Sequence, residues 1–215
     1  MPRKKLIRFL ENQQRKNLIE PGKEFFGKLK GKWNELYFSN KGEIVLELGC
    51  GKAEYTTQLA LKEPARNFIG VDVKGARLWF GSNYSEKLTI LNTAFLRCPI
   101  YKLDEHFGKD EVTEIWIPFP DPFPLKEGRR LTSPFYIKKY LNILRKSGII
   151  HFKTDDSILF EYSLNSFTEC GFKAIKHSYD IHNSDISGPA REIITNYENY
   201  FIKKNRKICY GMFGI

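Results

Sequence analysis

The chain has 215 residues, of which 41% are hydrophobic and 14% aromatic, a composition typical of a globular protein and not of a disordered one. Thirty-five lysines and arginines against 25 aspartates and glutamates leave a formal charge of +10. No apolar run reaches the roughly 18 residues that cross a bilayer, and no signal-peptide pattern opens the chain, so we expect a soluble, cytoplasmic protein without membrane contact. The four cysteines stand apart with no Cys-x-x-Cys spacing, which predicts neither disulfides nor a metal site.

Positive charge gathers in the first 32 residues, which we predict to form a basic N-terminal arm ahead of one domain at 33–215. The segment 1–32 holds ten lysines and arginines and three glutamates, so it contributes +7. Such a segment attracts polyanions, because neutralising phosphates releases condensed counterions. A solvated tail that keeps the protein in solution is the alternative, and the charge alone does not decide between them.

Predicted strands and helices alternate along the rest of the chain. In chain order we expect a strand at 44–49, a helix at 55–62, a strand at 67–72, a helical stretch through 79–80, strands at 88–91 and 112–117, a helix at 135–145, a strand at 149–153, a helix at 158–170 and a β-rich remainder. This alternation favours an α/β fold with a mostly parallel sheet and helices on both faces. Ligands bind outside the carboxyl ends of the strands in such sheets, so functional residues should directly follow the strands.

The first predicted strand runs into Glu47-Leu-Gly49-Cys-Gly51, an acid and two glycines at a strand-to-helix turn. Two glycines spaced by one residue let the backbone approach a ligand closely. A dinucleotide-binding fold would have its third glycine at Glu54, where a negative charge repels pyrophosphate at the helix N-terminus. The Glu47 carboxylate suits a cationic ligand instead, and S-adenosylmethionine carries an ammonium and a sulfonium. A purely structural turn after a buried strand is the alternative.

Two further polar positions follow predicted strands. Asp72 ends the second strand, where an acid accepts hydrogen bonds from a ribose diol, although it could also cap the following helix. Asn92 and Thr93 end the third predicted strand and could hydrogen-bond an adenine edge. Both of these residue types also simply favour turns.

The fourth predicted strand runs into a proline-rich loop, Ile117-Pro-Phe-Pro-Asp-Pro-Phe-Pro124. Four prolines in seven residues stiffen this loop and hold Asp121 between two aromatic rings. An acid so placed can read the N1 and N2 donors of guanine while the rings stack on the base. Three cations that could take phosphates follow: Lys126, Arg129 and Arg130. A rigid structural loop with a solvated basic tip is the alternative.

Four segments, in order along the chain, resemble the tRNA (guanine-N7-)-methyltransferase family. They are the glycine loop, the proline-rich loop with Arg129-Arg130-Leu131, His151-Phe-Lys-Thr-Asp155 and Thr195-Asn-Tyr-Glu198. The resemblance spans about residues 40 to 200. It implies a Rossmann-like class I S-adenosylmethionine-dependent methyltransferase with a mostly parallel seven-stranded sheet, formed by residues 33–215. The implied substrate is tRNA, in which a variable-loop guanosine accepts the methyl group at N7.

The resemblance also implies roles for individual residues. The implied cofactor-binding residues, which include the two glycines of the loop, are Glu47, Gly49, Gly51, Asp72, Asn92, Thr93 and Asp121. Asp121 is in addition the catalytic candidate. The implied substrate-binding residues, which include the three cations after the proline-rich loop, are Lys126, Arg129, Arg130, Asp155, Thr195, Asn196, Tyr197 and Glu198. The sequence departs from the family pattern at three positions, with Ala53 for the third glycine, Phe123 for tryptophan and Leu125 for a lysine that Lys126 replaces with a shift of one residue.

Guanine N7 carries a free lone pair, so the reaction needs positioning and no strong general base, and none of the four histidines is required for one. A fixed carboxylate near the base favours the transition state as positive charge moves onto the purine, and Asp121 is our candidate. For Asp155 an ion pair with Lys153 is the plain alternative, and Thr195 and Glu198 could belong to an ordinary strand. Three other readings stay open: a methyltransferase for small molecules or proteins, a non-catalytic RNA-binding module, and a nicotinamide dehydrogenase, which Glu54 disfavours. Monomer and homodimer are both compatible with the sequence.

Overall fold

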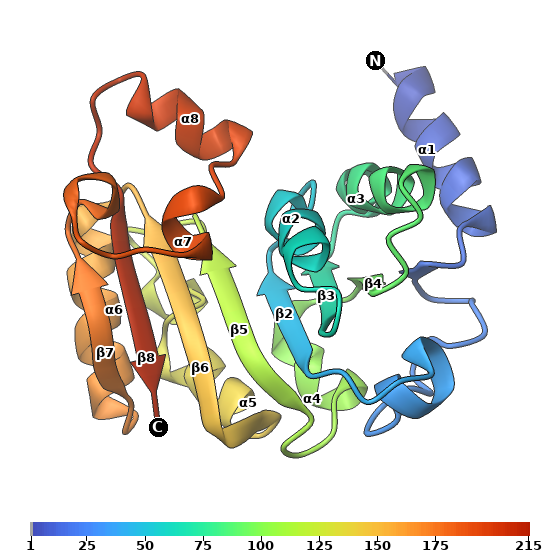
Figure 1. The fold of residues 1–215 in the computed structure, drawn as a ribbon, viewed down its shortest axis with the longest axis horizontal. Helices are drawn as coiled ribbons and strands as arrows, with labels where there is room; N and C mark the ends of the chain where they lie inside the picture. The colour runs from blue at the N-terminus through green and yellow to red at the C-terminus, as the bar shows by residue number, and fades with distance from the viewer. Residues whose placement is uncertain (1) are drawn as a thin grey trace.

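A computed structural model describes residues 2–215, which form an eight-stranded sheet flanked by helices (Figure 1). The strands lie side by side in the order β1-β4-β3-β2-β5-β6-β8-β7. Their bounds are β1 Leu18–Ile19, β2 Ile44–Leu48, β3 Asn67–Asp72, β4 Thr93–Arg97, β5 Val112–Pro118, β6 Leu144–Thr154, β7 Lys173–Ser178 and β8 Cys209–Gly214. Only the pairs of β8 with β6 and with β7 are antiparallel. The mostly parallel sheet is therefore confirmed, with one strand more than expected because the short β1 pairs with β4.

Helices cover both faces of the sheet, as the alternation predicts. They are α1 Pro2–Gln14, α2 Glu54–Lys62, α3 Gly75–Lys87, α4 Leu103–His106, α5 Pro134–Leu141, α6 Ser157–Glu169, α7 Pro189–Glu192 and α8 Asn196–Ile202. Single helical turns span Trp33–Phe38, Ile100–Lys102, Glu127–Arg129 and Ile181–Asn183. Helices α4, α5 and α6 pack on one face, whereas α2 and α7 pack on the other (Figure 1). Among the described residues no helix is both long and apolar enough to cross a membrane.

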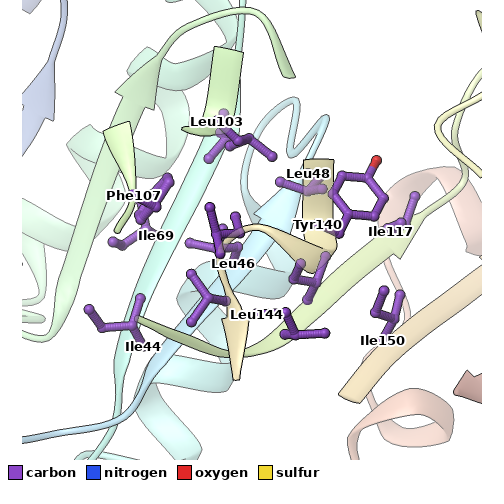
Figure 2. Packing of buried hydrophobic residues seen from close by; sticks show 14 of the residues in the cluster. Ile44, Leu46, Leu48, Ile69, Leu103, Phe107, Ile117, Tyr140, Leu144 and Ile150 are labelled. Atoms are coloured by element: carbon purple, nitrogen blue, oxygen red, sulfur yellow. The ribbon is translucent and has the colours of Figure 1, made fainter. Parts of the chain in front are cut away.

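Strand β2 lies in the middle of the sheet and is buried on both of its faces. Ile44, Leu46 and Leu48 point into the larger core cluster, where they meet Leu103 of α4 and Tyr140 of α5 (Figure 2). A strand buried on both sides reads as a continuous apolar run, which explains the pattern at the start of the domain. Because side chains alternate along a strand, the acid at position 47 points to the opposite face, toward α2.

Most predicted elements are confirmed to within one or two residues, and these are β2, β3, β5, α2 and α6. The helix predicted at 135–145 ends four residues earlier, at Leu141, and β6 begins before 149. Leu144, whose spacing placed it on the helix face, pairs instead with Val112 at the start of β6. Its burial in the core satisfies the same apolar pattern, so spacing alone could not place the helix end.

The strand predicted at 88–91 is wrong, because these residues form the turn after α3 and the strand begins at Thr93. Thr89 adopts a left-handed backbone conformation with φ 54°, which no strand tolerates. Leu91 is 81% exposed, so it contributes nothing to the core that its side chain suggests. The β-rich remainder is also wrong in part, since α7 and α8 lie between β7 and β8.

The segment predicted as a basic arm lies against the domain through α1 and β1. The Asn12 side-chain amide donates to the Gly75 carbonyl oxygen at 2.9 Å, which joins α1 to the start of α3. The Lys23 ammonium donates to the carbonyl oxygens of Arg15 and Leu18, both at 2.7 Å. At least one of the positive charges in residues 1–32, that of Lys23, therefore stabilises the fold of this segment.

Candidate active site

The glycine loop bends sharply between β2 and α2. Gly49 and Gly51 have φ of 68° and 56°, which glycine adopts without steric cost. Ala53 also has a positive φ, 59°, at the position where the family pattern has a third glycine. Its methyl group is accommodated because α3 carries Gly81 opposite; a Cβ on Gly81 would lie 2.6 Å from that of Ala53. The departure at position 53 is thus matched by a glycine in the neighbouring helix.

Glu47 provides a buried carboxyl group at the floor of this loop. Its Oε2 accepts a hydrogen bond from the backbone N–H of Thr56 at 2.7 Å and another from the Thr56 hydroxyl. Burial raises the pKa of Glu47 to about 8, although the hydrogen bonds from Thr56 oppose this shift. The group is therefore poised to ionise when a cation binds beside it.

Asp72 lies at the carboxyl end of β3 and ties that end to the glycine loop. One oxygen accepts from the Gly51 N–H at 2.9 Å and the other from the Lys74 N–H at 2.8 Å. The N-cap residue of α3 is Lys74, so Asp72 closes the turn before the helix and is not its cap. Each carboxylate oxygen still has a lone pair for a further donor, so the ribose role remains chemically available.

A cavity of about 530 Å³ opens at the carboxyl ends of β2 and β5. This volume lies in the range of about 300–1,000 Å³ that small-molecule sites occupy. Three loops line it: the glycine loop, the proline-rich loop and the start of α8. The lining residues are Glu47, Gly49, Cys50, Gly51, Lys52, Glu54, Arg77, Pro118, Phe119, Asp121, Thr195, Asn196 and Tyr197. The structure thus brings most of the predicted cofactor residues together with three of the predicted substrate residues.

The proline-rich loop holds Asp121 at the mouth of this cavity. Phe119 and Phe123, on either side of Asp121, have φ of 51° and 40°, which is a strained backbone conformation for aromatic residues. Such strained residues cluster at functional sites. Phe119 is fixed by a backbone hydrogen bond to the Lys153 carbonyl oxygen at 2.8 Å. Asp121 is exposed and, among the described residues, has no hydrogen-bond partner. Its carboxylate is therefore free to face a ligand.

Arg130 was predicted to bind phosphate, and the structure gives it a different task. Its side chain is only 5% exposed, and its guanidinium lies 4.2 Å from the Tyr162 ring centre. It donates to the Pro122 carbonyl oxygen at 2.9 Å and pairs with Glu127 at 2.9 Å. Arg130 therefore braces the proline-rich loop from inside, whereas Lys126 and Arg129 remain exposed.

Asn92 and Thr93 lie at the amino end of β4, away from the carboxyl ends of the strands, and neither residue lines the cavity. The Asn92 amide donates to the Arg66 carbonyl oxygen at 2.8 Å, and the Thr93 hydroxyl donates to that of Ile90 at 2.9 Å. The carboxyl end of β4 is instead Arg97, followed by Cys98 and Pro99. The strand predicted at 88–91 therefore placed the carboxyl end of this strand six residues too early.

Glu198 is completely buried and holds α8 on the domain. Its Oε1 accepts from the Lys153 ammonium at 2.7 Å and lies 2.8 Å from His182 Nε2. Lys153 also donates to the Tyr55 hydroxyl at 2.8 Å and to the Ala190 carbonyl oxygen at 2.7 Å. The predicted substrate role of Glu198 is thus replaced by a structural one. The ion pair between Lys153 and Asp155 is likewise wrong, since Asp155 pairs elsewhere.

The residues before Glu198 close one side of the cavity. The Thr195 hydroxyl accepts from the Glu198 N–H at 3.1 Å and so caps α8. Both carboxylate oxygens of Glu54 accept hydrogen bonds from Asn196, one from its backbone N–H and one from its amide, each at 2.6 Å. The Tyr197 side chain, by contrast, is 52% exposed at the rim. The bridge from Glu54 to Asn196 across the cavity had no signal in the sequence.

The fold is that of methyltransferases. The structure resembles that of the 16S rRNA methyltransferase KamB with a TM-score of 0.68 and 14% identity, over 91% of this chain and 97% of the other. It resembles an antibiotic-related methyltransferase with a TM-score of 0.65 and 14% identity, over 86% of this chain and 92% of the other. These likenesses, with the glycine loop and its acid at the end of β2, define a class I methyltransferase fold.

Sequence comparison then gives the family. A family model described as "Putative methyltransferase" matches residues 41–210. A tRNA (guanine-N(7)-)-methyltransferase of Christiangramia forsetii is 41% identical over 98% of this chain and 97% of its own length. One from Cytophaga hutchinsonii is 40% identical over 99% of this chain and 98% of its own. The chain belongs to the tRNA (guanine-N(7)-)-methyltransferase family, and the resemblance noted from the motifs is confirmed.

Proposed function

We propose that the protein transfers the methyl group of S-adenosylmethionine to N7 of a variable-loop guanosine in tRNA. The observation that carries this proposal is that Glu47 of β2 and the glycines after it line the same cavity as Asp121, Phe119 and Tyr197. The first set suits a cationic nucleoside cofactor, and the second suits a flat base with N–H donors. We expect the enzyme to act in the cytoplasm as a monomer or homodimer.

The residues present fit S-adenosylmethionine. The buried Glu47 carboxyl offers an anionic partner at the cavity floor, and the backbone at Gly49 and Gly51 leaves room for close approach. Asp72, with free lone pairs beside the loop, would take the ribose hydroxyls. When bound, the cofactor supplies a methyl group on a positively charged sulfur.

The chain's own contribution to the reaction is placement and electrostatics. Phe119 and Tyr197, with ring centres 5.3 Å apart, form an aromatic wall against which the guanine can stack. Asp121 accepts from the base and favours the positive charge that develops on it as N7 attacks. No residue has to remove a proton, because the N7 lone pair is already free. Lys126, Arg129, Asp155 and the 195–197 segment would hold the surrounding RNA.

Transfer of labelled methyl from S-adenosylmethionine to unmodified tRNA, with nucleoside analysis of the product, tests this proposal. We expect the label in 7-methylguanosine. Asp121→Ala, made in an exposed loop, should keep the fold but lose turnover by about 10²-fold or more. Label in another nucleoside, or normal turnover by the folded variant, would contradict the assigned site or the assigned role.

A further inference from the structure

A second hollow, of about 320 Å³, opens beside the active-site cavity. Its lining residues are Asp155, Ser157, Tyr179, Arg206, Lys207 and Cys209. We call it the Arg206 pocket. It lies at the carboxyl end of β6, which ends at Thr154, and at the start of α6. The reaction itself makes no use of this space, since the cofactor and the target base both occupy the larger cavity.

A chain of contacting side chains runs from one hollow to the other. The ring centre of Phe119, in the larger cavity, lies 5.3 Å from that of Tyr197. The Tyr197 ring centre lies 4.8 Å from that of Phe201. The Arg206 guanidinium lies 5.3 Å from the Phe201 ring centre and pairs with Asp155 at 2.8 Å. The pKa of Tyr197 is raised by burial and by the charges of Asp155 and Asp121, which lie in different hollows. The exposed edge of α8 is therefore the ridge between them.

The chain that leaves α8 is strongly basic and open to solvent. Residues 203–207 hold four cations and no acid, and all five residues are exposed. The Lys204 ammonium lies 4.2 Å from the ring centre of Tyr200, which is 53% exposed. Among the described residues neither Lys203 nor Lys207 forms an ion pair. Cations interleaved with exposed aromatic rings are the surface that a single-stranded nucleic acid binds.

We propose that the Arg206 pocket receives the nucleotide that adjoins the target guanosine in the RNA strand. Arg206 and Lys207 bind its phosphate, and the ridge at Tyr197 separates it from the base in the active-site cavity. The phosphate competes with Asp155 for the Arg206 guanidinium, so RNA binding frees this carboxylate for a hydroxyl or base donor. The inference rests on the proposed function, because it takes the guanosine to lie in the larger cavity.

The charge part of the proposal is tested with Arg206→Gln/Lys207→Gln, which removes the two cations that line the pocket. Direct retention of tRNA, measured with S-adenosylhomocysteine present, requires no turnover and is independent of the methylated position. We expect weaker binding by about tenfold at physiological salt, and a salt slope that falls by about one for each cation lost from phosphate. The control variant is Lys109→Gln/Lys146→Gln, which removes two exposed cations near the amino ends of β5 and β6. Equal behaviour of both variants would overturn the proposal.

The pocket itself is tested with Ser157→Phe, which fills the hollow from the exposed first turn of α6 and changes no charge. We expect weaker tRNA binding by about tenfold, unchanged affinity for S-adenosylmethionine and an unchanged melting temperature. Wild-type affinity for tRNA in this variant would show that only diffuse positive charge attracts the RNA to this surface. It would overturn the proposal that a nucleotide binds in the Arg206 pocket. Methylation by the wild-type protein is measured separately, so a failure of the proposed function is distinguishable from a failure of this inference.

Discussion

At the scale of single residues, the carboxyl group of Glu47 sets the electrostatic character of the cofactor cavity. Burial raises its pKa to about 8, so at neutral pH the free protein holds this group mostly protonated. A cationic ligand selects the carboxylate form, and binding near neutral pH should therefore release a proton. The affinity for S-adenosylmethionine should rise between about pH 6 and pH 8, by up to about tenfold for each unit, and level off above.

Calorimetric titrations in buffers of different ionisation enthalpy measure both the proton release and the affinity. The matched variant is Glu47→Gln, which keeps an acceptor for Thr56 but cannot ionise, and its affinity should be weak and independent of pH in this range. An affinity of the wild-type protein that does not change between about pH 6 and 8 would contradict a protonated Glu47 in the empty cavity.

Individual site residues were predictable where a strand end was predictable. Glu47 lies near the end of β2 and Asp121 follows β5, two strands whose apolar runs are unmistakable, and the structure places both residues in the cavity. Asn92 was misplaced because a solvent-exposed leucine pair imitated a strand. Arg130 and Glu198 have the expected charges, but Arg130 packs on Tyr162 and Glu198 pairs with Lys153, both far away in the chain. Sequence alone does not show whether such a charge faces the ligand or the interior.

At the scale of elements, α2 and α8 close the cavity through the two hydrogen bonds between Glu54 and Asn196. We predict that this bridge positions the 195–197 segment for the substrate. Glu54→Ala should raise KM for tRNA about five- to tenfold, which corresponds to about 1 kcal/mol. One to two hydrogen bonds at a solvated site contribute a free energy of this size. The KM of Glu54→Gln, which keeps one acceptor, should lie between those of the wild-type protein and Glu54→Ala. The kcat should change little in either variant.

Lys62→Ala is the matched control for this bridge. It removes the ion pair of Lys62 with Glu192, which joins α2 to α7 away from the cavity; both side chains are about half exposed. Steady-state kinetics should show less than about a twofold effect, as for most exposed ion pairs. Comparable losses in the Lys62 and Glu54 variants would mean that the bridge only stabilises the fold and does not position substrate.

The core elements of the sheet were predictable because strands buried on both faces read as unbroken apolar runs. The two short helices α7 and α8 were not, since their stability comes from tertiary contacts such as the buried pair of Lys153 and Glu198. Short helices carry little sequence signal of their own. β1 escaped prediction for the same reason: two residues, Leu18 and Ile19, gain strand structure only by pairing with β4.

At the scale of the whole molecule, the sheet brings segments from residue 47 to residue 197 to one cavity. The family and the fold class followed from four motifs in order, and the first three of these motifs lie where strands β2, β5 and β6 end. The way in which α8 folds back over the carboxyl ends of β5 and β6 did not follow from the sequence (Figure 1).

Transfer to N7 is tested by a comparison of methyl transfer to two tRNA transcripts that differ at one ring position of one nucleotide. In one, the variable-loop guanosine is intact; in the other it is 7-deazaguanosine, which has carbon in place of N7. We predict efficient transfer to the first and none to the second, with equal binding of both. Equal transfer to both transcripts would show that the methyl group goes to another atom, and would contradict the assignment.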